Sequence, residues 1–348
     1  MKNKTILITG AAGFVASHLI EHLLRHTDVK IIGCDSLTYA GTWNRLRDAN
    51  LNGIRCFEHP RFKPMIFDFR QPAEPNLIKE LQDVTHIIHM GAESHVDHSI
   101  TDPMRFVQAN VVGTVNMLEL AKQLNNLEVF VQFSTDEVFG PATTESTGFK
   151  ELDRHDPKNP YAATKSAAEQ MVNAFANTYK MSCIVTNGMN IFGERQHPEK
   201  FIPLCIKRAL SGGTLFIHAS PDKKTAGSRH YIHGRNVADA ILFLLKAAPW
   251  KPRTVERFNI VGELRVDNHT LAKTINEYVL ELAPLKGLQP VGANFELVDF
   301  HSSRPGHDLV YALDGSKMEA MGWTPPKSFH ESLRKTITWY LENQTWLK

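Results

Sequence analysis

Short apolar runs rich in β-branched residues alternate with amphipathic stretches along the first half of the chain. The runs have the length and composition of buried strands. The stretches Val15–Arg25 and Met104–Leu124 between them carry apolar residues at helical spacing. Alternating strands and helices predict a parallel sheet covered on both faces, with a ligand crevice beyond the carboxyl ends of the strands. The predicted strands are Thr5–Thr9, Lys30–Cys34, Lys63–Phe67, His86–Met90, Val129–Phe133 and Ser182–Thr186.

This rhythm changes after about residue 188, where polar residues, Gly and Pro become frequent. A helical run at Val237–Leu245 and a strand-like run at Phe258–Val261 then indicate a return to the sheet. Two more helical patterns follow, at Thr270–Leu282 and His330–Glu342. We therefore predict two interleaved domains. The larger, sheet-containing domain covers residues 1–188 plus about 229–262, and a smaller α/β domain covers about 189–228 plus 263–348.

Composition narrows the class of protein. The 348 residues carry a net charge of +2, with 42% hydrophobic and 22% charged residues, as in ordinary globular proteins. The small net charge argues against nucleic acid or a membrane surface as the main partner, and no apolar run approaches membrane-spanning length. The four cysteines form no Cys-x-x-Cys pair, so we expect neither a disulfide framework nor a zinc site, and a reducing cytoplasm as the location.

A glycine turn links the first predicted strand to the first predicted helix. Gly10 permits a tight turn, and Gly13 lets the backbone approach a pyrophosphate at the positive helix N-terminus. Asp35 ends the second strand, where a carboxylate accepts hydrogen bonds from ribose hydroxyls and repels a 2′-phosphate. Together these features predict a Rossmann-like site for NAD rather than NADP. The alternative, an ordinary turn followed by a capping acid, explains fewer of them.

Polar groups cluster where the fifth predicted strand ends. Ser134-Thr135-Asp136-Glu137 places two hydroxyls and two acids directly after a buried run, where polar groups are costly unless they are used. Tyr161 and Lys165 follow one helical turn apart, so their side chains share a face, and the lysine can stabilise a tyrosine phenolate. A tyrosine base beside a carboxylic acid and a carboxylate predicts redox chemistry and an elimination in one site. The alternative is a surface helix that carries Tyr and Lys by chance.

These motifs resemble those of a known family almost from end to end. The chain resembles the extended short-chain dehydrogenase/reductases, and within them the nucleoside-diphosphate-hexose 4,6-dehydratases. The specific signal is Thr135-Asp136-Glu137, because related sugar epimerases usually lack that acid pair. The matching segments are Gly10–Ser17, Asp35–Gly41, Ala92–Asp97, Ser134–Gly140, Asn159–Lys165, Pro198–Pro203 and Arg304–Asp308.

The resemblance implies a mechanism and a substrate. Tyr161, assisted by Thr135, removes the proton of the C4 hydroxyl while hydride passes from C4 to NAD⁺. Glu137 then removes the C5 proton, Asp136 protonates the departing C6 hydroxyl, and hydride returns to C6. The implied substrate is a nucleoside-diphosphate-glucose, dTDP-glucose first and UDP-glucose next. The products are a 4-keto-6-deoxy sugar nucleotide and water.

The resemblance also implies binding residues and an assembly. A homodimer would form through a four-helix bundle made by Met104–Leu124 and Tyr161–Lys180 of each subunit. The implied cofactor-binding residues are Gly10, Ala12, Gly13, Phe14, Val15, Asp35, Ser36, Leu37, Thr38, Asp68, Phe69, Met90, Gly91, Ala92, Ser94, Asn110, Ser134, Tyr161 and Lys165. The implied substrate-binding residues are Ser94, Thr135, Asn190, Lys200, Phe201, Phe216, His218, Arg229, Asn268, Arg304 and His307.

Two other functions remain open at this stage. One is a sugar-nucleotide epimerase or decarboxylase on the same scaffold, and the other is a dinucleotide-binding sensor without chemistry. The acid pair argues against the first, and the joint presence of the five predicted catalytic residues argues against the second. Ile191, His218 and Ser303 depart from the usual family pattern, so thymine and uracil both remain open as the base. The histidines at 86, 89, 95 and 98 lack the spacing of a metal site.

Overall fold

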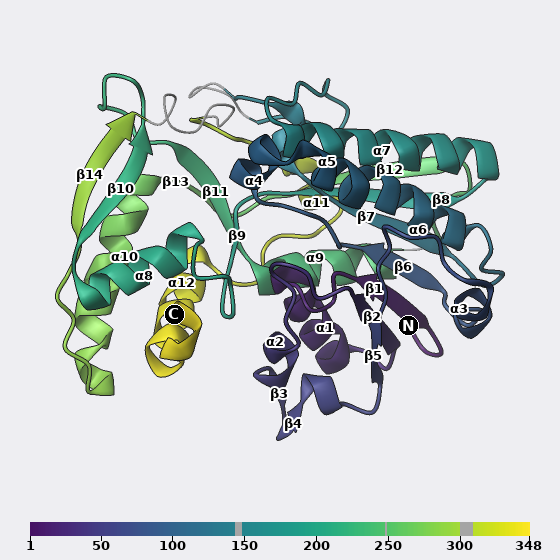
Figure 1. The fold of residues 1–348 in the computed structure, drawn as a ribbon, viewed down its shortest axis with the longest axis horizontal. Coiled ribbons are helices and arrows are strands. Elements are labelled where there is room, and N and C mark those ends of the chain that lie inside the picture. Colours follow the sequence, from purple (N-terminus) through teal and green to yellow (C-terminus); the bar gives the residue numbers. More distant parts are fainter. Residues whose placement is uncertain (143–147, 248, 300–308) are drawn as a thin grey trace.

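A seven-stranded parallel sheet forms the centre of the larger part of the molecule (Figure 1). The structure is a computed structural model that describes residues 1–142, 148–247, 249–299 and 309–348. The strands lie in the order β12-β8-β7-β6-β1-β2-β5, and every neighbouring pair is parallel. Their bounds are β1 (Thr5–Thr9), β2 (Lys30–Asp35), β5 (Phe62–Ile66), β6 (His86–His89), β7 (Val129–Thr135), β8 (Ser182–Gly188) and β12 (Thr254–Ile260).

The strand order reverses between β1 and β6. From β1 the chain moves outward through β2 to β5, and from β6 it moves the opposite way through β7 and β8 to β12. Such a reversal opens a crevice beyond the carboxyl ends of the two central strands, where ligands bind in open α/β sheets. The glycines after these strands, Gly10 and Gly91, stand at this point.

Side chains alternate between the two faces of the sheet because successive strand residues point in opposite directions. In β1, Ile6 and Ile8 pack into a core covered by α1 (Phe14–His26) and α9 (Gly234–Lys246). Leu7 packs into the opposite core, which is covered by α6 (Gly113–Ala121) and α7 (Pro160–Tyr179). All three side chains are at most 1% exposed, which explains why the strands read as nearly continuous apolar runs.

A second, smaller part has its own small sheets and its own core, at the left of Figure 1. The parallel pair β10–β14 packs with helices against the strands β13-β11-β9. The predicted α/β architecture with a smaller second part is therefore present. Its elements are β9 (Ile191–Phe192), α8 (Phe201–Ser211), β10 (Thr214–Ala219), β11 (Ser228–His233), β13 (Leu264–Asp267), α10 (Asn268–Leu282), β14 (Asn294–Asp299) and α12 (Phe329–Glu342).

Two predicted elements differ in a way that matters for the site. The helical pattern Met104–Leu124 is divided into α5 (Pro103–Phe106), a π-helical turn at Val107–Val112, and α6. Strand β7 continues to Thr135, two residues beyond the apolar run, because Ser134 and Thr135 still pair with β8. The remaining short α-helices and strands are α2 (Asn44–Arg47), β3 (Asn50–Leu51), β4 (Ile54–Arg55), α3 (Pro75–Glu80), α4 (Val96–Thr101) and α11 (Ser316–Ala320).

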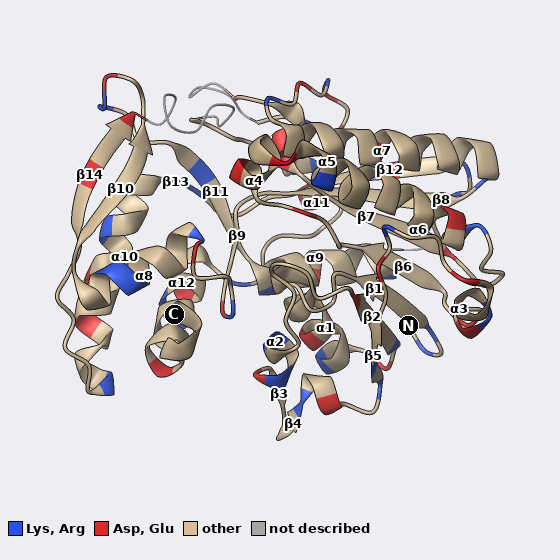
Figure 2. Ribbon diagram, in the orientation of Figure 1, with Lys and Arg blue, Asp and Glu red and all other residues tan. Residues whose placement is uncertain are grey.

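Charges of both signs are interspersed over the elements of both parts (Figure 2). This distribution agrees with the small net charge of +2. Among the helices that the structure describes, none combines the length and the apolar character needed to cross a bilayer.

Candidate active site

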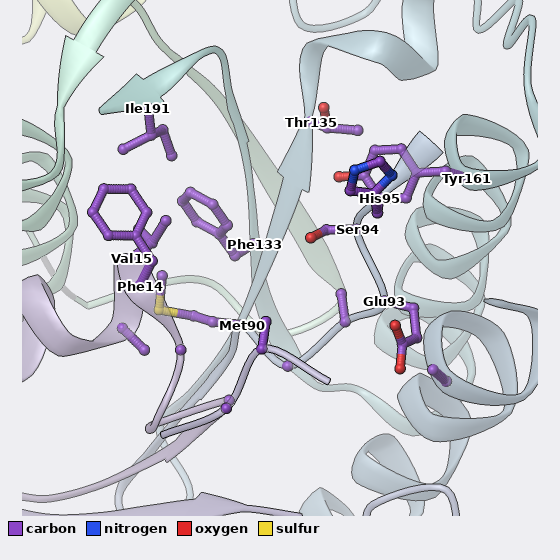
Figure 3. Close-up of a pocket in the computed structure, with 18 of the residues that line it drawn as sticks. Phe14, Val15, Met90, Glu93, Ser94, His95, Phe133, Thr135, Tyr161 and Ile191 are labelled. Carbon is purple, nitrogen blue, oxygen red and sulfur yellow. The ribbon is translucent and has the colours of Figure 1, made fainter. Parts of the chain in front are cut away.

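A cavity of about 430 Å³ opens at the reversal point of the sheet. Its two sides differ in character (Figure 3). Apolar side chains, including Phe14, Met90 and Phe133, gather on one side, whereas Thr135 and Tyr161 lie on the other. The cavity can therefore hold a ligand that needs one apolar wall and one reactive, hydrogen-bonding wall.

The glycine turn fits a dinucleotide. Gly10 has a positive φ of 65°, and a Cβ atom added there would lie 2.7 Å from the Cα of Gly91, so no larger residue fits without separating the two strands. Helix α1 begins after Gly13 with no side chain capping its first N–H groups. These donors at a positive helix end are free to bind a pyrophosphate. The tight glycine turn that the sequence predicts is therefore present at the start of α1.

Asp35 lines the cavity, and its carboxylate also binds the backbone of two neighbouring segments. One carboxylate oxygen accepts a hydrogen bond from the backbone N–H of Leu37 at 2.7 Å, and the other accepts from Ala12 at 3.0 Å. Burial raises the pKa of Asp35, and these two backbone donors oppose that rise. Both oxygens keep lone pairs for further donors, so a ribose can bind to a carboxylate that the backbone already holds in place.

Arg45 is a site residue that the sequence analysis missed. It is 2% exposed, and its guanidinium donates to the carbonyls of Ala12, Ala40 and Arg195 at 2.9, 2.6 and 2.9 Å. Burial lowers its pKa to about 10. Arg45 thus links the glycine turn, through Ala12, to the segments that contain Ala40 and Arg195. Nothing in the local sequence distinguishes it from a surface arginine.

The end of β7 carries a buried acid. Asp136 is 5% exposed and accepts a hydrogen bond from Thr135 Oγ1 at 3.0 Å, while its other oxygen has no partner among the described residues. Burial raises the pKa of Asp136 from 3.8 to about 7, and the neighbouring Glu137 carboxylate contributes to this rise. Asp136 can therefore carry a proton near neutral pH, as a proton donor must.

Glu137 lies in a different environment from its neighbour. It is only partly buried, and its Oε2 accepts a hydrogen bond from Asn159 Nδ2 at 2.9 Å. The Asn159 side-chain oxygen accepts from the backbone N–H of Ala162 at 2.8 Å and so caps α7. One asparagine therefore joins Glu137 to the helix that bears Tyr161. The acid pair is separated into a buried member and a hydrogen-bonded, more exposed one.

Tyr161 and Lys165 lie one turn apart on α7, and both are buried. Burial raises the pKa of Tyr161, and the Glu137 charge raises it further, whereas a hydrogen bond with Thr135 opposes the rise. Burial lowers the pKa of Lys165 to about 8, and its ammonium donates to the Phe133 carbonyl at 2.7 Å. A Tyr161 phenolate would therefore depend on nearby positive charge, such as the ammonium of Lys165.

All five predicted catalytic residues line this one cavity. Most predicted cofactor residues line it too, as do the substrate candidates Asn190 and Lys200. Ala12, Leu37 and Asn110 do not. The buried Asn110 amide instead accepts from the backbone N–H of Glu93 at 2.9 Å and donates to its carbonyl at 3.0 Å. Lining residues that the sequence analysis did not list include Tyr39, Arg45, Arg70, Glu93, His95, Gln196, His197, Glu199 and Tyr311.

Asp68, predicted to bind adenine, already has a partner. Arg70 forms a paired ion bridge with its carboxylate, with N–O distances of 2.7–3.0 Å, and both residues line the cavity. The pKa of Asp68 is lowered by this arginine. An adenine ring at this end of the cavity would therefore meet an Asp–Arg pair rather than a lone acid.

The other predicted substrate residues lie in the smaller part of the molecule. Arg229, on β11, and Asn268, at the start of α10, both lie near Gly227, where an added Cβ would be 3.6 and 3.8 Å from their side-chain nitrogens. Phe216 and His218 lie on β10, and Phe201 begins α8. Arg304 and His307 are outside the described residues.

Comparisons with known proteins identify the family. The family described as GDP-mannose 4,6 dehydratase matches residues 7–336. A curated dTDP-glucose 4,6-dehydratase from Haemophilus influenzae is 36% identical over 98% of both chains. The chain belongs to this 4,6-dehydratase family.

Solved members of the family share the fold. DesIV, the dTDP-glucose 4,6-dehydratase of Streptomyces venezuelae, solved with NAD and TYD bound, is 32% identical and covers 99% of both chains with a TM-score of 0.83. The Bacillus anthracis dTDP-glucose 4,6-dehydratase in complex with NAD is 29% identical over 99% of this chain, with a TM-score of 0.79. The predictions of a Rossmann-like α/β fold, of an enzyme of this family and of NAD as its cofactor are confirmed.

The preference for NAD over NADP leads to a direct prediction. We expect nucleotide extracted from the denatured protein to be NAD(H), because the Asp35 carboxylate would repel a 2′-phosphate. Chromatography of the extract measures both nucleotides. An Asp35→Asn variant, which removes the charge but keeps the shape, should bind the two cofactors more equally. NADP(H) as the main species in the wild-type extract would contradict the role of Asp35.

Proposed function

We propose that this enzyme catalyses the dehydration of dTDP-glucose to the 4-keto-6-deoxy sugar nucleotide and water, with UDP-glucose as the next candidate. The main support for this proposal is that one cavity is lined both by the Gly10–Gly13 turn and by Thr135, Asp136, Glu137, Tyr161 and Lys165. A dehydrogenase needs only the tyrosine and the lysine. The acid pair, with one member buried and one hydrogen-bonded, supplies the proton transfers of an elimination.

Each residue has a separate task in this proposal. Tyr161 accepts the proton of the C4 hydroxyl, and Thr135, which is hydrogen-bonded to it, orients the phenol. When bound, NAD supplies a transient hydride acceptor for C4 and the hydride that C6 finally receives. The C4 ketone acidifies the C5 proton, which Glu137 removes. Asp136 protonates the C6 hydroxyl and water leaves. C5 then takes back a proton as C6 receives the hydride, so that the net loss is one water.

Residues around the cavity suit a cofactor that stays bound. The Gly10–Gly13 turn would hold the pyrophosphate, Asp35 a ribose, and the apolar residues Phe14, Met90 and Phe133 a ring face. We also propose that residues 1–188 plus about 229–262 bind NAD, and that about 189–228 plus 263–348 bind the nucleotide sugar. Asn190 and Lys200, which come from the second set, reach the same cavity.

The test is mass spectrometry of products from a panel of dTDP, UDP and GDP hexoses. We expect loss of one water from dTDP-glucose, at the highest kcat/KM of the panel. A product of unchanged mass would indicate an epimerase, and loss of carbon dioxide a decarboxylase. Absence of any turnover across the panel would contradict the proposed dehydration.

We further propose a homodimer through a four-helix bundle. The second half of Met104–Leu124 forms α6, which packs beside α7. Met171 of α7 and Val115 of α6 remain only partly buried beside the core. We expect light scattering at micromolar concentration to give twice the 39.2 kDa subunit mass, and substitution of Met171 by Glu to favour monomers. A monomer at every concentration for the wild type would contradict the proposal.

The cytoplasm remains the location we propose, with all four cysteines free and buried.

A further inference from the structure

A buried carboxylate lies directly behind the catalytic wall. Glu169 is on α7, one turn beyond Lys165, and its side chain is 0% exposed. It does not line the cavity. Charged side chains are almost never fully buried unless they are paired, so the contacts of Glu169 indicate which groups it stabilises.

Glu169 joins α7 to three neighbouring strands. Its Oε1 accepts hydrogen bonds from Ser134 Oγ at 2.5 Å, on β7, and from Asn187 Nδ2 at 2.9 Å, on β8. Its Oε2 pairs with Arg257, on β12. Asn187 also donates to the carbonyl of Thr135 at 3.0 Å. The carboxylate therefore adds side-chain hydrogen bonds to a strand end whose Ser134 and Thr135 also pair with β8 through the backbone.

The same carboxylate faces the catalytic lysine. Burial lowers the pKa of Lys165 to about 8, and the negative charge of Glu169 opposes this change. Among the described residues, His89 of β6 also interacts with Lys165, and burial and the lysine charge lower the pKa of His89 to about 3. The phenol of Tyr161 lies one turn before Lys165 on the same helix. Arg257 and His155, whose Nε2 is 3.6 Å from Oε2, face Glu169 itself.

From these contacts we infer that Glu169 is a positioning residue for the reaction, which holds the end of β7 through Ser134 and Asn187 and supports the positive charge of Lys165. The inference rests on the proposed function for its effect on rate. Without Glu169, Lys165 would lose its ammonium charge at a lower pH and would stabilise the Tyr161 phenolate less. The C4 oxidation would then slow at neutral and alkaline pH.

The first test measures Lys165 itself and needs no substrate. Holoenzyme labelled with [6-¹³C]lysine gives a titrating Cε signal for Lys165, assigned by its absence in Lys165→Arg. We expect Glu169→Gln to lower the pKa of Lys165 by at least about one unit, as loss of a nearby opposite charge does. Glu169→Asp, which keeps the charge, should leave the pKa near the wild-type value.

The second test is the rate of C4 oxidation, followed by stopped-flow appearance of reduced nicotinamide. We expect Glu169→Gln to slow this step by about 10²-fold, which is the scale for a small displacement of catalytic groups. The alkaline limb of its pH profile should also move to lower pH, whereas KM changes little. Glu21→Gln is the control. Glu21 is on α1, on the other side of the sheet from α7, and the substitution breaks its ion pair with Arg195, in which the N–O distance is 2.9 Å. It should change neither the Lys165 pKa nor the rate of C4 oxidation.

The outcomes separate the two proposals. If wild type converts no nucleotide sugar, the proposed function fails, and the lysine titration still decides the role of Glu169. If Glu169→Gln leaves the Lys165 pKa within about 0.3 unit and the oxidation rate within about twofold of wild type, the inference is overturned. Should Glu169→Gln fail to fold with Arg257 left unpaired, the double variant Glu169→Gln/Arg257→Gln removes that charge and undergoes the same two measurements.

Discussion

Replacing Tyr161 with Phe is expected to abolish the first oxidation, so that neither reduced nicotinamide nor product appears. The change removes only the phenolic oxygen from a buried ring that packs edge-on against Phe106, with 6.3 Å between ring centroids. The loss of one positioned base costs about 10²–10⁴ in rate. Stopped-flow absorbance measures the oxidation, and mass spectrometry measures the product.

The control for this variant is its cofactor content. Tyr161→Phe should keep the extracted NAD(H) and the melting temperature close to wild type, because the ring and its packing remain. A variant that still reduces NAD⁺ at a near wild-type rate would exclude Tyr161 as the base. Thr135, which is hydrogen-bonded to both the phenol and Asp136, would then be the next hydroxyl to examine.

Most of the central sheet could be predicted from the sequence because its strands are buried on both faces. Such strands read as short apolar runs, and β1 and β8 begin at the predicted residues. The ends were less predictable. The apolar run of β7 stops at Phe133, but pairing with β8 continues to Thr135, so the Thr135 hydroxyl lies on the strand itself. Hydrophobicity does not report backbone pairing at polar positions.

The parts of the site that sequence reasoning missed are those whose role depends on distant partners. Arg45 contacts the carbonyl of Arg195, 150 positions away in the chain, and Glu169 contacts Arg257, 88 positions away, on β12. A glutamate four residues after a lysine on a helix is typical of an exposed ion pair. Only the fold shows that this glutamate is fully buried.

The different environments of Asp136 and Glu137 predict a separation of the two halves of the reaction. Glu137→Gln should leave Tyr161 able to oxidise C4 but slow the loss of the C5 proton by about 10²–10⁴. Asp136→Asn should oxidise C4 and impair the loss of water, because an amide is a far weaker proton donor than a carboxylic acid. Both variants should therefore accumulate reduced nicotinamide, which Tyr161→Phe does not.

Substrate deuterated at C5, in ordinary water, distinguishes these outcomes. Wild type should replace that deuterium with a solvent proton during turnover, and Glu137→Gln should retain it. Because the pKa of Asp136 is raised from 3.8 to about 7, its acid form is lost as pH rises through neutrality, so the elimination in wild type should slow above about pH 7. If Glu137→Gln exchanges deuterium and turns over at nearly the wild-type rate, the carboxylate that Asn159 holds at the end of β7 has a structural role, and a different group removes the C5 proton.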